Sequence, residues 1–373
     1  MRCADRRWLC DTVGMARVRV LGLADGLVAR RAALLVCMAG LAGWSAVALP
    51  AQENSTPTLH VYPNLVQIPT LVMGQDHEPV SGIAEGRFFV SIDGGPKFRV
   101  THARLEGDDP ISLAIVLDVS QPFPSLMARM DDVVAGLAPL SLHAKDLVSV
   151  YSMDCNLIRS VDDVPATPVT LKRGVELVLQ PWKDHGRDRW RSACKEPANL
   201  WDSLKIVTEA LYQHPGRRVI LVVTDGVDRG SKISWNELRL YAQARAVAIF
   251  GMVQTGDATF RTGTRNPEDL FNSVCDLTGG IVMTAAEKGV AEQLQQFTEM
   301  VRGRYVLEFP HPVDTKGGYH DMSISIEKSE AMILPTGIGI PADKATVLED
   351  PTTVPMDPSG APQLGKRKVI APN

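Results

Sequence analysis

Four short apolar runs separated by helical stretches dominate the middle of the chain. The runs are ISLAIVLDV, DLVSVYSM, RRVILVVTD and AVAIFGMV, and they begin at residues 111, 146, 217 and 246. Each ends at polar or turn residues, which is typical of parallel strands covered on both faces. Helical stretches lie between and after them, at 125–140, 198–213, 235–246, 267–280 and 287–303. The pattern predicts an α/β fold, a doubly wound and mostly parallel sheet over residues 111–303.

The segments on either side of this domain are predicted to be β-rich. Within residues 52–110, the stretch FFVSIDGGPKFRV has two alternating runs around Asp93 to Pro96, which is typical of a hairpin. Residues 304–340 return to strand patterns, with Met322, Ile324 and Ile326 on one face. Neither segment is long enough to be stable alone, so we expect them to pair in a small β-sandwich-like module. The Pro-rich tail, residues 341–373, is predicted to be largely disordered.

The first 51 residues have the composition of a secretory signal peptide. Residues 1–31 hold seven arginines and three aspartates, and residues 32–51 carry no charge. Cleavage is expected after Ala51 or Ala48. A retained membrane anchor is the alternative, because twenty uncharged residues could span a bilayer. Met15 is a second possible start. The expectation is an exported protein, whether periplasmic, cell-surface or secreted.

Charge and motif content exclude several classes of function. The whole chain carries −4, and because residues 1–31 contribute +4, the remaining residues carry −8. A nucleic-acid binder needs a basic face for phosphate contacts, so this balance argues against one. The chain has no GxSxG, phosphate-binding loop or dinucleotide fingerprint. We therefore expect a protein that is not an enzyme.

Polar residues follow two of the predicted strands, at the sheet edge where doubly wound domains bind ligands. The first run continues into Asp118, Val119 and Ser120, and the third into TDGVDRG, residues 224–230. Carboxylate and hydroxyl oxygens suit a hard cation such as Mg²⁺. Asp118 and Ser120 lie at the first of these strand ends, and Asp225 lies at the second. Asp228, in the same turn, is expected to be a solvated turn residue.

The order of these segments resembles the von Willebrand factor A domain. More closely, it resembles the von Willebrand factor A (VWFA)-related family described from acidobacteria. The matching text is GRFFVSIDGGPKFRV, DPISLAIVLDVS, NLWDSLKIV, RRVILVVTDGVDRGS, CDLTGG and RYVLEFPHPVDTKGGYHDMSI, and it covers about residues 58–340. The resemblance implies a metal-ion-dependent adhesion site, built from a DxSxS loop, a threonine from a second loop and an aspartate from a third.

Only part of that site carries over to this sequence. Asp118 and Ser120 match the first two members of the DxSxS loop, and Asp225 matches the third-loop aspartate. The resemblance therefore implies that Asp118, Ser120 and Asp225 are the candidate metal ligands. The remaining loop serine is replaced by Pro122, and the threonine position is Ala198. Proline and alanine side chains supply no oxygen, so we expect a degenerate site, with weak Mg²⁺ or Mn²⁺ binding at most and no cofactor.

Each of these residues also has a simpler interpretation. Asp118 and Asp225 could accept hydrogen bonds from loop N–H groups at the strand ends. Ser120 could cap a helix that begins near Pro124.

A long insert, residues 181–197, is predicted to lie on the same edge. It contains Trp182, Trp190 and Arg191, and aromatic residues beside arginine favour a protein partner. Trp201 sits in a helical pattern and is expected in the core.

The family fold places Cys155 and Cys194 in loops at that edge, so we predict a disulfide between them. Cys275 is expected to be a buried free thiol. Taken together, these features predict an exported, non-enzymatic protein-interaction or adhesion-type protein that needs no metal. A metal-free envelope scaffold is the alternative, and a weak Mg²⁺-dependent adhesion site is a third possibility.

Overall fold

The computed structural model describes residues 65–367 with gaps. The gaps are residues 77, 120–126, 128–129, 141, 186–198, 215, 255–266, 286–288, 313–317, 338 and 341–359. The predicted signal peptide, residues 1–51, lies outside the described residues. Within the described ranges, no helix combines the length and the apolar character needed to cross a membrane.

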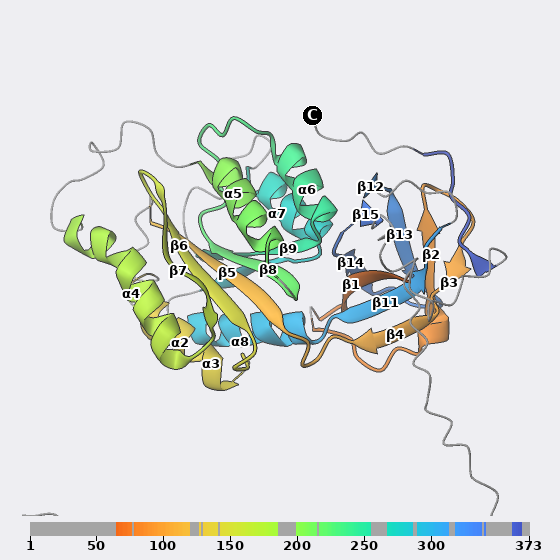
Figure 1. Ribbon diagram of the computed structural model, residues 1–373, viewed down its shortest axis with the longest axis horizontal. Coiled ribbons are helices and arrows are strands. Elements are labelled where there is room, and N and C mark those ends of the chain that lie inside the picture. The colour runs from red at the N-terminus through yellow and green to blue at the C-terminus, as the bar shows by residue number, and fades with distance from the viewer. Residues whose placement is uncertain are drawn as a thin grey trace, which may run out of the picture. The chain divides into compact units, whose positions relative to one another are not determined.

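A six-stranded, mostly parallel sheet forms the centre of the α/β domain (Figure 1). The strand order is β10-β9-β8-β5-β6-β7, and only the β6–β7 pair is antiparallel. The predicted α/β fold class is therefore confirmed. The bounds are β5 (Ile111–Asp118), β6 (Leu147–Met153), β7 (Leu157–Pro165), β8 (Arg217–Val223), β9 (Val247–Gln254) and β10 (Val282–Ala285).

Helices cover both faces of this sheet, which explains why its strands are continuous apolar runs. All eight residues of β5 are buried, and Leu113, Ile115 and Leu117 join one apolar core while Ala114 and Val116 join the other. The first core includes residues of α2 (Met130–Ala135), α3 (Leu137–Leu140), α4 (Pro168–His185) and α8 (Val290–Arg302). The second includes residues of α5 (Leu200–Tyr212), α6 (Trp235–Ala244) and α7 (Pro267–Thr278).

Three elements of the α/β domain were not predicted, namely the strands β7 and β10 and the helix α4. The edge strand β7, with the sequence LIRSVDDVP, is half-exposed along its length and carries several charges. Helix α4 precedes the predicted insert and includes the first five residues assigned to it, 181–185. The insert is therefore shorter than expected, because those five residues form the last turn of a helix.

Strands before and after the α/β domain form shared antiparallel sheets. One sheet has the order β14-β1-β11-β4 and another has the order β13-β2-β3, while β12 pairs with β15. Apolar residues of both larger sheets, among them Ile68, Phe309 and Phe88, meet in one core. The bounds are β1 (Leu65–Met73), η1 (Glu85–Arg87), β2 (Phe88–Ile92), β3 (Phe98–Arg99), β4 (His102–Leu105), β11 (Tyr305–Pro310), β12 (Gly318–Tyr319), β13 (Met322–Ile326), β14 (Met332–Pro335) and β15 (Gly339–Ile340).

Part of the C-terminal tail is ordered against the β2–β3 hairpin. Gly365 N donates to Ile92 O at 3.0 Å, and Arg367 N donates to Asp93 O at 3.0 Å. Arg367 also pairs with Asp321 at 2.7 Å. The tail was expected to be largely disordered, but at Gly365 and Arg367 its backbone N–H groups bond to the hairpin.

Two neighbouring segments carry the chain out of the β module and back into it. Glu106 N donates to Arg304 O at 2.7 Å, and Gly107 N donates to Arg302 O at 3.0 Å. Charged side chains surround these segments in a group that we name the crossing cluster. Its members are Glu106, Asp109, Asp146, Arg217, Arg302 and Arg304.

The centre of the crossing cluster is a buried ion pair between Arg304 and Glu106. Arg304 Nε lies 2.7 Å from Glu106 Oε2, and Nη2 lies 3.1 Å from Oε1. Their side chains are 1% and 0% exposed. Arg304 Nη1 has no hydrogen-bond partner within the described part of the chain. Removing either residue would leave the other as an uncompensated buried charge, so each depends on the other.

Helix α7 ends at Thr278, and the two glycines that follow, Gly279 and Gly280, allow the chain to pack closely against β9. Gly280 N donates to Cys275 O at 2.9 Å, and Thr278 Oγ1 accepts a hydrogen bond from Ile249 N at 3.1 Å. A Cβ atom on Gly280 would lie 2.1 Å from Ile249 O. The LTGG stretch thus has a structural role, because only glycine permits this approach.

Candidate functional site at the carboxyl edge of the sheet

The strand order of the central sheet reverses between β5 and β8. From β5 the chain builds outward through β6 and β7, and from β8 it builds in the opposite direction through β9 and β10. Ligands of such sheets bind in the crevice beyond the strand ends at this reversal. Asp118 is the last residue of β5, and Thr224 and Asp225 directly follow β8. The topology therefore brings together the two loops that the sequence singled out.

Thr224 links the two strand ends. Its Oγ1 donates to Asp118 Oδ2 at 2.7 Å and accepts from Gly226 N at 3.2 Å, and both Thr224 and Asp118 are 1% exposed. Gly226 has φ +74°, and a Cβ atom there would lie 3.0 Å from the Phe271 ring. Glycine is therefore required at position 226. The turn that it forms keeps Thr224 within hydrogen-bonding distance of Asp118.

Asp225 is held by an arginine from its own loop. Arg229 Nη1 donates to Asp225 Oδ1 at 3.3 Å, and Arg229 Nη2 pairs with Oδ2, which makes the contact bidentate. Val227 N also donates to Oδ1 at 3.0 Å, while Val227 O accepts from Arg229 Nη1 at 3.0 Å. The Asp225 side chain is 5% exposed and that of Arg229 is 36% exposed. The buried carboxylate is therefore neutralised within the chain.

The surroundings of Arg229 favour its charged form. Burial acts to lower the pKa of the guanidinium, but the hydrogen bond to Asp225 and the charges of Asp225, Asp118 and Asp228 together raise it above its ordinary value. Arginine thus remains a cation at any physiological pH.

Asp228 anchors this loop to the start of α5. Its carboxylate accepts from Trp201 N at 3.3 Å and from Ser231 N at 3.0 Å. In return, Asp202 in the first turn of α5 accepts from Lys232 N at 2.9 Å. Asp228 was expected to be a solvated turn residue; it is half-buried in this turn, and its oxygens bond to backbone N–H groups of its own loop and of α5.

Replacing Asp228 with alanine should lower the free energy of unfolding by about 1–2 kcal/mol, the range for losing a capping side chain. The reason is that Trp201 N and Ser231 N would lose their acceptor together. Urea denaturation of both proteins measures the change. Asp108→Ala is the matched control, because that side chain is 83% exposed and, among the described residues, its ion pair is with His143. Equal losses in the two variants would contradict the capping role.

Several of the predicted site residues are not placed with Asp118 and Asp225. Trp182 belongs to the last turn of α4, but its side chain lies outside the described residues. Trp201 is 5% exposed and its ring stacks 6.3 Å from that of Phe271, so its prediction as a core residue is confirmed. Four predicted residues lie outside the described part of the chain altogether: Ser120, Trp190, Arg191 and Cys194.

The described cysteines fall into two states. Cys155 is disulfide-bonded, and its partner lies outside the described residues. Its pairing with Cys194 stays a prediction. Cys275 is free and fully buried, as expected, and burial raises the pKa of its thiol well above the ordinary value.

The carboxylates at this edge, as far as the structure describes it, are already engaged by groups of the chain itself. Both oxygens of Asp225 are bonded to Arg229, and Asp118 accepts from Thr224. Across the described ranges, no group of three or more His, Cys, Asp or Glu residues is arranged to hold a metal. Thr224 and Arg229 were not identified from the sequence. The one available indication was an arginine four residues after Asp225 in a glycine-containing turn.

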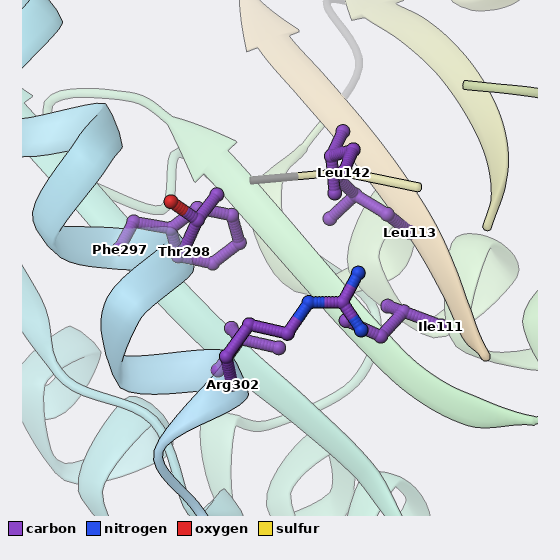
Figure 2. A pocket seen from close by; sticks show the side chains of 7 residues that line it. Ile111, Leu113, Leu142, Phe297, Thr298 and Arg302 are labelled. Atoms are coloured by element: carbon purple, nitrogen blue, oxygen red, sulfur yellow. The ribbon is translucent and has the colours of Figure 1, made fainter. Parts of the chain in front are cut away.

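A small apolar pocket lies at the opposite end of β5. Figure 2 shows it between Ile111 and Leu113 of β5 and Phe297, Thr298 and Arg302 of α8. Its free space, about 10 Å³, holds about one water molecule. Small-molecule sites are typically larger by more than tenfold, about 300–1,000 Å³, so this pocket is not a candidate ligand site.

No protein-family model matches the chain, and no curated protein matches it. Solved structures with a similar fold include proximal thread matrix protein 1 from the mussel byssus, at 12% identity and TM-score 0.38, covering 53% of this chain and 49% of that one. BatB from Bacteroides thetaiotaomicron has 14% identity and TM-score 0.36, covering 51% and 98%. The vWF domain of the pilus tip protein Mfa5 from Porphyromonas gingivalis has 10% identity and TM-score 0.35, covering 52% and 95%. This chain spans about half the length of the mussel protein, and each likeness is one of fold only.

Proposed function

We propose that this chain is an exported, non-enzymatic protein of the von Willebrand factor A-related type that contacts a protein partner through the carboxyl edge of its sheet. One observation carries the proposal. At the strand-order reversal, where such sheets bind ligands, the buried carboxylate of Asp225 is already neutralised by Arg229. Contact with a partner at this edge therefore needs neither a metal ion nor a cofactor.

The exposed part of this edge supports a protein as the partner. Arg229 is 36% exposed, and Lys232 beside it is exposed. Arginine is enriched among the residues that contribute most to protein–protein affinity. The charge of −8 outside residues 1–31 disfavours nucleic acid. Export, to the periplasm, the cell surface or the medium, is proposed from the presequence alone, and no membrane contact is proposed beyond that segment.

A photo-activated cross-linker placed at Lys232 tests this proposal, with the same group at Lys172 as the control. Lys172 is also exposed, but it lies in the first turns of α4, after β7 has returned to the amino edge of the sheet. We expect an envelope protein to be captured from Lys232 in the presence of a chelator, and much less capture from Lys172.

Two other outcomes separate the alternatives. Capture that requires added Mg²⁺ would contradict metal independence and favour a weak Mg²⁺-dependent adhesion site. Equal capture from both positions, or none from either, would remove this edge as the interface and favour the metal-free envelope scaffold.

A further inference from the structure

The guanidinium of Arg229 forms an ion pair with Asp225, the carboxylate that a bound metal ion would need as a ligand. Asp225 is 5% exposed on its side chain, and its two oxygens both receive hydrogen bonds from the two terminal nitrogens of Arg229. Bidentate pairing of this kind is the strongest that an arginine and a carboxylate form. A metal ion that approached either oxygen would meet the positive charge of the arginine first.

The position of Arg229 is fixed by the loop and not by this ion pair alone. Arg229 Nη1 also donates to Val227 O at 3.0 Å, and the loop is anchored on α5 through Asp228 and Asp202. The side chain thus reaches back four residues along a turn that is held at both ends. A residue held in this way loses little conformational entropy when it forms the pair.

The buried carboxylates at these strand ends require a compensating positive charge. Asp118 and Asp225 are nearly fully buried at adjacent strand ends, and the charges of Asp118 and Asp228 act on Arg229 together with that of Asp225. Buried carboxylates are costly unless a positive charge or hydrogen-bond donors compensate them. Among the described residues, the ion-pair partner of Asp225 is Arg229.

We propose that Arg229 is the resident cation of this site, and that its guanidinium takes the place of a divalent metal ion beside Asp118 and Asp225. The inference rests on the proposed function, in which the carboxyl edge of the sheet contacts a partner without a metal ion. It identifies Arg229 as the source of the positive charge at that edge. It follows that removing the arginine exposes Asp225 to divalent cations that the natural chain does not bind.

Titration of the purified full chain with Mn²⁺ tests the inference, with the thermal midpoint and the electron paramagnetic resonance of free Mn²⁺ as readouts. Millimolar Mn²⁺ should leave the natural protein unchanged. Arg229→Ala should unfold at a lower temperature, bind Mn²⁺ at least about tenfold more tightly than the natural protein, and recover thermal stability with it. Arg229→Lys should remain insensitive to Mn²⁺, because it retains the charge.

Two controls identify the carboxylate that binds the ion. Arg229→Ala combined with Asp225→Asn should lose the acquired Mn²⁺ binding. Arg239→Ala removes an arginine of α6 that bonds to Asn236 and Gln243, so it should gain no Mn²⁺ binding. If Arg229→Ala does not fold, refolding of Arg229→Ala and Arg229→Gln in millimolar Mn²⁺ replaces the titration, and recovery by Mn²⁺ supports the proposal.

Several results would overturn it. The first is that the natural protein binds Mn²⁺ as tightly as Arg229→Ala does. The second is that Arg229→Ala folds but gains no Mn²⁺ binding. The third is that Mn²⁺ does not help the unfolded variants to refold. None of these readouts depends on a partner, so the inference can fail while the cross-linking result from Lys232 stands.

Discussion

Replacing Glu106 with alanine is expected to lower the free energy of unfolding by about 3–5 kcal/mol, the range for breaking a buried ion pair by removing one partner. The variant would leave Arg304, which is 1% exposed, as an uncompensated buried charge. Arg304 Nη1 has no hydrogen-bond partner within the described residues, so none of them offers a second acceptor that could replace Glu106. Chemical denaturation monitored by circular dichroism measures the loss.

Two comparison variants make this test specific. Lys172→Ala removes one member of a solvent-exposed pair with Asp132, and it should leave the free energy of unfolding almost unchanged. Glu106→Leu combined with Arg304→Met removes both buried charges, so it should be more stable than Glu106→Ala alone. A loss below about 1 kcal/mol for Glu106→Ala would show that the crossing cluster does not depend on this pair.

Replacing Gly280 with alanine is expected to lower the free energy of unfolding by about 3 kcal/mol, the upper range for overpacking a core. The added Cβ atom would lie 2.1 Å from Ile249 O and 2.7 Å from Ile249 C. Both are backbone atoms of β9, so either the strand or the end of α7 must move. Thermal unfolding measures the change.

Gly86→Ala is the control for this variant. A Cβ atom on Gly86 would meet nothing within 4 Å, and its backbone is not in the left-handed region. Its stability should therefore stay close to that of the natural protein. The steric explanation would be wrong if Gly280→Ala and Gly86→Ala lost equal stability.

The central sheet could be predicted from the sequence because its strands are buried on both faces. Each of the four apolar runs contains a strand, and β5 shows why. All its residues are buried, and those from Ile111 to Leu117 are apolar or small. The edge strand β7 was missed because one side of it faces solvent, and its charged residues hide the apolar pattern.

The candidate site was predicted only in part. Asp118 and Asp225 were identified because they lie at the ends of two buried strands and match the adhesion-site motif, and the strand order then places the two loops side by side. Their hydrogen-bond partners Thr224 and Arg229 were not identified. The hydrogen bond from Thr224 to Asp118, for example, joins residues 106 positions apart. The pairing of Arg229 with Asp225 depends on a turn whose shape is set by Gly226 and by the contacts of Asp228 with α5.

The sequence by itself therefore determined the fold class and the two strand ends that carry acidic residues, because burial on two faces leaves a local pattern of apolar residues. The tertiary structure alone decided what those acids do. Whether Asp225 meets a metal ion or an arginine depends on the path of the loop that follows it, and local sequence patterns do not encode that path. In this chain the loop returns Arg229 to the carboxylate.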